Sequence, residues 1–331
     1  MSSGHPYDAL TPDLILDSVE AAGFTVNGRL FPLNSYENRV YQVGLEDQTP
    51  VIAKFYRPER WTEAQIIEEH TFTHELVAGE IPVVASLPLA NGDFLGRAGD
   101  FLFALFPQRG GQAPDVSVPD TLYRLGQWLG RLHAIGAKRA FEYRPSLDIL
   151  ATLTSSRDLL LEKGFIPPSL EEAYTSLLRD LIELTGQRIA DAGEVDWIRL
   201  HGDCHMGNIL VREDQMLLVD LDDARQGPAM QDLWLLLNGE RPEREAQFSE
   251  LLEGYEQFYD LNLRERYLIE PLRTARVVGH AAWLGKRWDD PTFPQHFPWF
   301  GQERFWSDHI LMLREQLAAL QEPPIGLPGQ G

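Results

Sequence analysis

The sequence predicts an α+β fold of two lobes, in which a small antiparallel β-sheet with one main helix precedes a larger, mostly helical lobe. Short β-branched and aromatic runs are concentrated in the first third of the chain, and helical periodicity dominates afterwards. The composition changes at about residue 108, which divides the chain into predicted domains 1–107 and 108–331. With 331 residues, 44% of them hydrophobic, the chain is long enough to bury a sizeable core.

The elements of the first lobe begin with a short helix. Thr11 supplies an N-cap, Pro12 suits the first helical turn, and apolar residues continue along one face to Gly23. Two β-branched and aromatic runs follow at 37–45 and 49–56. Because only the polar residues EDQ separate these runs, they predict a β-hairpin.

The main helix of this lobe is predicted over 62–79, where Gly79 ends it and Glu69 lies on or beside an otherwise apolar face. Pro82 is expected to begin the next strand, and 101–111 forms a further buried strand that runs into a turn. The helices expected in the second lobe span 120–135, 146–163, 169–191, 229–237, 243–259, 265–288 and 303–320.

Composition excludes several classes of protein. Fifty acidic residues against 29 basic ones give a net charge of −21, which repels nucleic acid and anionic lipid. No run approaches the ~18 to 20 apolar residues that a membrane helix needs, and the first ten residues lack the pattern of a signal peptide. The only cysteine, Cys204, agrees with a reducing compartment. We therefore expect a cytoplasmic protein with no nucleic-acid or membrane partner.

The stretch RLHGDCHMGNILV, residues 199–211, carries the strongest chemical signal. His201, Asp203 and Asn208 reproduce the H-x-D-x-x-x-x-N spacing of a kinase catalytic loop. Asp203 is then the base that orients the acceptor hydroxyl, and Asn208 offers an oxygen to Mg²⁺. Asp220 ends the apolar strand MLLV and supplies the carboxylate that the same cation requires.

The small lobe contributes a candidate lysine. VIAK, residues 51–54, matches the strand pattern that places a lysine on nucleotide phosphates, so Lys54 is expected to bind ATP and Glu69 to tether it. Glu68 remains an alternative to Glu69. Asp222 remains an alternative to Asp220, because strand alternation places both on one face.

Four segments resemble the aminoglycoside phosphotransferase and choline kinase-like superfamily. They are ENRVYQV (37–43), LGQWLGRLHAIG (125–136), LHGDCHMGNILV (200–211) and VDLDDARQGPAMQDLW (219–234). Together with LNSYENRVYQ (33–42), KFYRPERWT (54–62) and DPTFPQHFPW (290–299), they resemble a bacterial serine/threonine protein kinase type that acts in stress responses.

This resemblance covers almost the whole chain and implies a bilobal, protein-kinase-like fold. It implies that Asp203 and Asp220 are the active-site aspartates, that Asn208 and Asp220 bind Mg²⁺, and that Ser35 belongs to the ATP site. It further implies a cytoplasmic monomer.

The loop LNSYEN (33–38) departs from protein kinases because it contains no glycine. The backbone N–H groups of Tyr36 and Glu37, with the Ser35 hydroxyl, would have to cover the phosphates. Leu221 and Asp222 stand where protein kinases carry Phe-Gly, so no phosphorylation switch is expected.

Two other classes of protein compete with a kinase. His201, Asp203 and His205 have the spacing of metal ligands in a hydrolase, although no further histidine completes that pattern. A regulatory pseudokinase is the second class, and the intact kinase residues argue against it. Cys204, beside the proposed base, is a redox sensor or a buried inert thiol.

The acceptor stays open between a protein serine or threonine and a cationic small molecule such as an aminoglycoside or choline. Seven aromatic residues lie close together in the sequence, and we expect them either to pack in the core or to form a cage around a cationic acceptor. They are Trp283, Trp288, Phe293, Phe297, Trp299, Phe300 and Trp306. We expect Asp232 to brace the catalytic loop by accepting backbone hydrogen bonds, and His201 to be structural.

Overall fold

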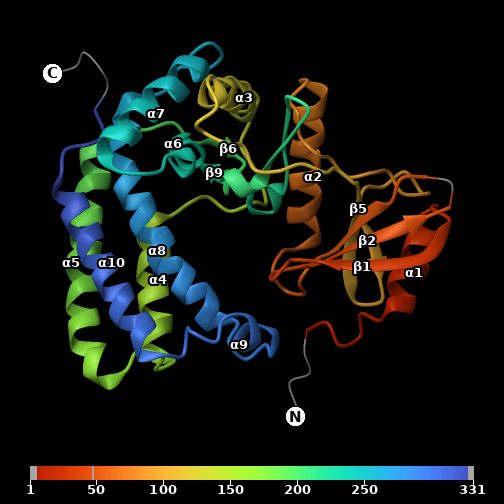
Figure 1. The fold of residues 1–331 in the computed structure, drawn as a ribbon, viewed down its shortest axis with the longest axis horizontal. Coiled ribbons are helices and arrows are strands. Elements are labelled where there is room, and N and C mark those ends of the chain that lie inside the picture. Colours follow the sequence, from red (N-terminus) through yellow and green to blue (C-terminus); the bar gives the residue numbers. More distant parts are fainter. Residues whose placement is uncertain (1–5, 47, 327–331) are drawn as a thin grey trace.

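The computed structural model describes residues 6–46 and 48–326 and has two lobes (Figure 1). The smaller lobe contains a five-stranded antiparallel sheet in the order β1-β2-β3-β5-β4. Its strands are β1 (Val26–Leu33), β2 (Arg39–Leu45), β3 (Val51–Phe55), β4 (Gly96–Ala98) and β5 (Phe101–Pro107). The predicted α+β class is confirmed.

The predicted hairpin is present as β2 and β3. Val40 lies opposite Lys54 in this pair, and Tyr41 lies opposite Ala53. Side chains alternate along β3, so that Ala53 is buried in the sheet core while Ile52 and Lys54 share the other face. The sheet therefore presents Lys54 toward the second lobe.

Two helices accompany the sheet: α1 (Pro12–Ala21) and α2 (Glu63–Ala78). A capping box formed by Thr62 and Gln65 begins α2, and Gly79 follows its end, as the sequence predicts. Figure 1 shows α2 between the sheet and the helical lobe. Because α2 contacts the turn at 221–223 of the second lobe, it joins the two parts of the molecule.

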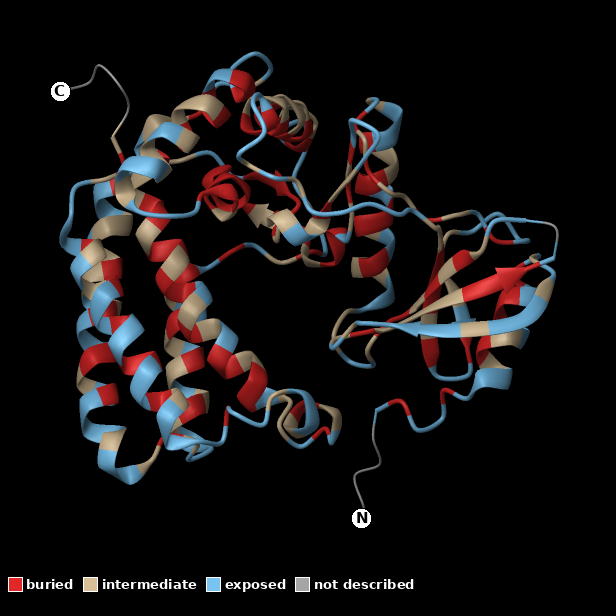
Figure 2. Ribbon diagram, viewed as in Figure 1, coloured by how far each residue is buried: buried red, intermediate tan, exposed pale blue. Residues whose placement is uncertain are grey.

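The second lobe is mostly helical. Its helices are α3 (Thr121–Gly136), α4 (Ile149–Glu162), α5 (Pro168–Ala192), α6 (Met230–Leu233), α7 (Arg241–Tyr255), α8 (Ile269–Lys286), α9 (Thr292–His296) and α10 (Glu303–Gln321). Figure 2 shows their buried residues gathered on the sides that face other helices. At Gly126, an added Cβ would lie 2.0 Å from the carbonyl oxygen of Leu251, so a side chain there would force α3 and α7 apart.

Four short strands support the polar motifs of this lobe. They are β6 (Ile198–Leu200), β7 (Ile209–Arg212), β8 (Gln215–Leu218) and β9 (Arg225–Gly227). β6 pairs with β9, and β7 pairs with β8, both antiparallel. The loop at 201–208 and the turn at 219–224 therefore leave neighbouring strand ends.

The structure differs from the sequence prediction in several places. β1 was not predicted, because almost all its side chains are exposed and no apolar alternation marks it. Pro82 does not begin a strand: its carbonyl and the Val84 N–H only form a single bridge to Leu218. The short helix α9 and the strands β6 and β9 were also missed.

No helix in the described part of the chain has the length and apolarity needed to cross a membrane. The division at residue 107 stays a prediction, although β5 ends there and the later segments contain no large sheet.

Candidate active site

A cavity of about 320 Å³ lies between the lobes. Its walls combine apolar side chains with a smaller number of polar ones. The apolar lining is Leu33, Val40, Ile52, Val84, Phe106, Pro107, Leu210, Val219 and Leu221, and the polar lining is Asn34, Ser35, Asn38, Lys54, Glu69, Arg109 and Asp220. Concave sites with apolar walls and a few convergent polar groups are the usual form of a small-molecule site.

Lys54 crosses this cavity from β3 to the second lobe. Its Nζ lies 2.7 Å from Asp220 Oδ1 and 3.2 Å from Asp222 Oδ1. Burial by itself would lower the pKa of Lys54, but the two carboxylates outweigh it and raise the pKa above its usual value. The lysine therefore stays charged and joins the lobes electrostatically.

Asp220 and Asp222 occupy different environments. Asp220 adopts a left-handed conformation, with φ of 62°, and its side chain is 54% exposed beside the cavity. The Asp222 side chain is buried, accepts a hydrogen bond from Asn38 Nδ2 at 3.1 Å and forms an ion pair with Arg60. Strand alternation cannot place these two aspartates on one face, because the strand β8 ends at Leu218 and a short 3-10 turn follows.

The electrostatics of Asp222 agree with a structural role. Burial alone would raise its pKa, but Lys54 and Arg60 hold the pKa well below its usual value. Arg60 also pairs with Asp223 at 3.1 Å. Asp222 is thus a permanently charged counterion for two cations, whereas Asp220 keeps exposed surface for a ligand.

The loop at 201–208 is held by Asp232 from α6. The Asp232 carboxylate accepts hydrogen bonds from the backbone N–H groups of His201 and Gly202, both at 2.8 Å. Its Oδ2 also lies 3.1 Å from His133 Nε2. The prediction that Asp232 braces this loop is therefore confirmed, and His201, fully buried with Nε2 3.0 Å from the Val219 carbonyl, is structural.

This loop joins Asn208 to the chain segment that leads into Asp220, and Asn208 in turn contacts Asp203. The Val219 N–H donates to the Asn208 carbonyl at 2.9 Å, which joins the loop to the residue before Asp220. Asn208 Nδ2 donates to the Asp203 carbonyl at 3.0 Å, so the amide oxygen of Asn208 remains available for a cation.

These residues fit a magnesium ion bound together with a nucleotide. Among the residues that the structure describes, no three His, Cys, Asp or Glu side chains are grouped closely enough to hold a metal by themselves. Magnesium, however, is usually bound by one or two protein oxygens, phosphate oxygens and water. Asp220 and Asn208 offer that donor set.

The predicted tether of Lys54 has a different environment. Glu69 lines the cavity and is buried, but Thr73 Oγ1 donates to its Oε1 at 3.0 Å. Within the described residues, the ion pairs of Lys54 within 4 Å are those to Asp220 and Asp222. Glu68 points elsewhere and accepts hydrogen bonds from the backbone at 142–144. Of the two glutamates, Glu69 is the one that lines the cavity.

Ser35 lies in the loop between β1 and β2 and lines the cavity. The second lobe reaches this loop through Glu37, whose carboxylate accepts hydrogen bonds from Trp283 Nε1 at 2.8 Å and Arg287 at 2.6 Å. Nearby, Arg57 pairs with Asp290 at 3.1 Å. In Figure 1, the α8–α9 corner extends from the helical lobe toward this loop.

The structure argues against two alternatives, a metal-dependent hydrolase and a redox-sensing cysteine. His205 Nδ1 accepts the Gly207 N–H at 2.9 Å and His201 is buried, so neither ring is arranged as a metal ligand. Cys204 is fully buried, and burial raises the pKa of its thiol well above the usual value, which makes it unreactive.

The aromatic residues pack in or against the core of the helical lobe. Phe293, Phe300 and Trp306 are fully buried. Trp283 is partly buried against this core, and the Arg287 guanidinium lies over its ring, 5.4 Å from the centroid. The face of Trp283 is therefore occupied by a cation of the protein itself.

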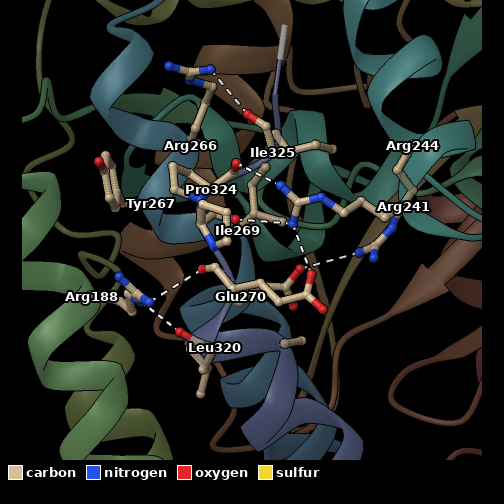
Figure 3. A pocket seen from close by; sticks show the side chains of 13 residues that line it. Arg188, Arg241, Arg244, Arg266, Tyr267, Ile269, Glu270, Leu320, Pro324 and Ile325 are labelled. Atoms are coloured by element: carbon tan, nitrogen blue, oxygen red, sulfur yellow. Dashed lines mark hydrogen bonds and ion pairs between the residues drawn. The ribbon is translucent and has the colours of Figure 1, made fainter. Parts of the chain in front are cut away.

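A second cavity, shown in Figure 3, is rich in arginine but serves the chain itself. Arg188, Arg241 and Arg266 donate to the backbone carbonyls of Leu320, Pro324 and Ile325. Its volume is only about 20 Å³, room for little more than a water molecule. These arginines fasten the C-terminal segment and do not form the phosphate site.

A cleft between a sheet lobe and a helical lobe, with a lysine on one side and an aspartate-bearing loop on the other, defines the kinase class of phosphotransferases. The model of the phosphotransferase enzyme family matches residues 30–268. The chain belongs to that family.

Particular relatives agree with this family. The chain is 44% identical to stress response kinase A of Escherichia coli (strain K12) over 326 residues, 98% of each chain. It is 42% identical to the serine/threonine protein kinase RdoA of Salmonella typhimurium over 323 residues, 97% of each. The solved structure of amicoumacin kinase hAmiN with AMP-PNP and Ca²⁺ superposes with a TM-score of 0.71 at 18% identity, covering 96% and 95% of the two chains. The predicted resemblance is confirmed.

Sequence reasoning missed three residues of the site: Asn38, Arg60 and Arg276. Arg276 of α8 lies 2.6 Å from Asp203 Oδ1, and Asn38 and Arg60 hold Asp222. The segments that contain Asn38 and Arg60 were noticed, but no spacing rule links them to a carboxylate 160 residues or more away.

Proposed function

We propose that this phosphotransferase moves the γ-phosphate of ATP, with Mg²⁺, to a serine or threonine hydroxyl of a protein. The observation that carries the proposal is the convergence of Lys54 from the sheet with Asp220 from the helical lobe on one cavity. The names of the curated relatives, a stress response kinase and a serine/threonine protein kinase, support a protein acceptor.

In this mechanism, the apolar walls of the cavity receive the base of the nucleotide, and Lys54 and Ser35 bind its phosphates. Asp220 and Asn208 would hold a Mg²⁺ ion, which when bound would supply positive charge to neutralise the phosphates. Glu69, buried near Lys54, adds negative charge that keeps the ammonium protonated.

Asp203 acts on the acceptor. The acceptor oxygen forms a bond to the γ-phosphorus while the bond to the β,γ-bridging oxygen breaks, and its electron pair leaves with ADP. The hydroxyl proton passes to the Asp203 carboxylate. Because Asp232 fixes the backbone before Asp203, the base is held in place without relying on its own side-chain contacts.

The test compares two aspartate variants with a control, using radiolabelled ATP and an extract of dephosphorylated proteins as acceptors. Asp203→Asn should abolish phosphate transfer and retain ATP binding, whereas Asp220→Asn should lose the Mg²⁺-dependent part of ATP binding. Asp180→Asn, at an exposed position on α5, should behave like the unaltered protein. Normal transfer by Asp203→Asn, or by Asp220→Asn, would refute the assigned role.

A further inference from the structure

The proposed base has a cationic neighbour that the nucleotide chemistry does not use. Arg276 NH1 lies 2.6 Å from Asp203 Oδ1, and His205 Nε2 lies 3.5 Å from Asp203 Oδ2. Arg276 is not among the residues that line the nucleotide cavity, and its side chain is 44% exposed. The side of Asp203 on which an acceptor must approach is therefore lined by an exposed arginine.

Arg276 belongs to one face of α8. Arg276, His280, Trp283 and Arg287 follow at intervals of four, three and four residues, which places them along a single stripe. The rings of His280 and Trp283 stack with centroids 5.8 Å apart. At the far end, Trp283 and Arg287 hold Glu37 in the loop that contains Ser35. This stripe thus connects the proposed base to the nucleotide loop and forms a wall of the acceptor side.

Three further carboxylates, two of them in contact with segments of the small lobe, are already paired with cations of the chain. Glu37 is bound by Arg287, Asp223 by Arg60 and Arg225, and Asp290 by Arg57. A positively charged acceptor that bound one of these three carboxylates would have to break its pair, at the cost of leaving an arginine without its partner.

A negatively charged acceptor would instead meet a cationic side chain, that of Arg276. Arg276 has five N–H donors, and its ion pair with Asp203 engages a single terminal nitrogen, NH1. The net charge of −21 has little effect on whether a cationic or an anionic acceptor binds, because at physiological ionic strength charges more than about 8 Å away are largely screened.

We propose that the acceptor carries a negative charge beside its hydroxyl group and that Arg276 binds it. The acceptor is a serine or threonine flanked by acidic residues. This inference rests on the proposed function and specifies its substrate class. It also separates the chain from kinases that bind cationic amines, because such acceptors would face Arg276 directly.

The experiment uses three peptides of one sequence, in which the central serine is flanked by glutamate, glutamine or lysine. Phosphate transfer is measured as kcat/KM with ATP and Mg²⁺ at physiological salt. The protein should prefer the glutamate peptide to the glutamine peptide by about tenfold, the effect of one charge-assisted contact. The lysine peptide should be the poorest acceptor.

Variants of Arg276 make the test specific. Arg276→Gln should remove the preference, and Arg276→Glu should reverse it, so that the lysine peptide becomes the best acceptor. Lys286→Glu changes the charge of an exposed residue on the same helix and should leave the preference unchanged. The KM for ATP and the thermal stabilisation by ATP should stay the same in all variants, which shows that they are folded.

The outcomes distinguish this inference from the proposed function. The role of Arg276 would be overturned if phosphate transfer showed no preference for acidic peptides, or if that preference survived Arg276→Glu. Efficient phosphorylation of an aminoglycoside would overturn it as well. If ATP binds normally but none of the peptides nor any extract protein is phosphorylated, the protein acceptor itself is wrong, and the inference fails with it.

Discussion

Glu265 accepts a hydrogen bond from the start of α6 and makes the stability of the helical lobe depend on pH. It is 2% exposed, and its Oε2 accepts the backbone N–H of Met230 at 2.8 Å. Met230 begins α6, the helix that contains Asp232. Burial raises the pKa of Glu265 from 4.5 to about 7; the Met230 N–H opposes this shift and Asp196 adds to it.

The sign of the effect follows from this raised pKa. The folded protein binds the proton of Glu265 more tightly than the unfolded chain, so the stabilisation is complete below about pH 4.5 and is lost as the pH rises through 7. At about 1.4 kcal/mol per pKa unit, the full effect is about 3 kcal/mol. Between pH 5 and pH 8.5, the free energy of unfolding should fall by about 2.5 kcal/mol from this group.

Glu265→Gln removes the charge and keeps an oxygen that can accept the Met230 N–H. Its free energy of unfolding should gain about 2.5 kcal/mol relative to the unaltered protein as the pH rises from 5 to 8.5. Urea unfolding followed by tryptophan fluorescence is suitable, because seven of the eight tryptophans follow residue 107. Glu253→Gln, at an exposed position on α7, is the matched control. Parallel pH profiles for Glu265→Gln and the unaltered protein would refute the reasoning.

Three further variants test residues that hold the candidate active site in place or bind its ligand. Asp232→Ala leaves three donors without their acceptor, and its free energy of unfolding should fall by about 3 kcal/mol in urea, with phosphate transfer lost. Gly202→Ala would place a Cβ 2.1 Å from the Asp223 carbonyl at φ of 87°, so transfer should fall sharply and thermal stability should drop; full activity would contradict this contact. Lys54→Met should weaken ATP binding in calorimetry by at least about tenfold, while Lys138→Met, at an exposed lysine, should not.

The fold was predictable where local signals agree with burial. The capping box of α2 and the alternation of β3 are visible in the sequence, and both elements formed as expected. β1 lacks such a signal, because it is stabilised by pairing with β2 while most of its side chains are exposed and only Val26 and Leu30 pack against the core. The bridge of Val83 to Leu218 joins residues more than 130 positions apart, which no local pattern encodes.

The candidate site was predictable to the extent that kinase chemistry fixes spacing within one loop. Asp203 and Asn208 are five residues apart, and a hydrogen bond between them explains that spacing. The partner of Asp203 on α8 was not predictable, because Arg276 is 73 residues away and single arginines carry no motif. Likewise, only the folded turn distinguishes the exposed Asp220 from the buried Asp222.

The way in which the C-terminal segment is attached affects how the protein tolerates substitutions and deletions in that segment. Arg188, Arg241 and Arg266 hold the carbonyls of Leu320, Pro324 and Ile325, which every amino acid possesses. Recognition of the main chain is insensitive to the side chains that it carries. Substitutions at the exposed positions 321–323 should thus be accepted far more readily than deletions, which would strip three guanidinium groups of their acceptors at once and remove the buried side chains of Leu320 and Ile325.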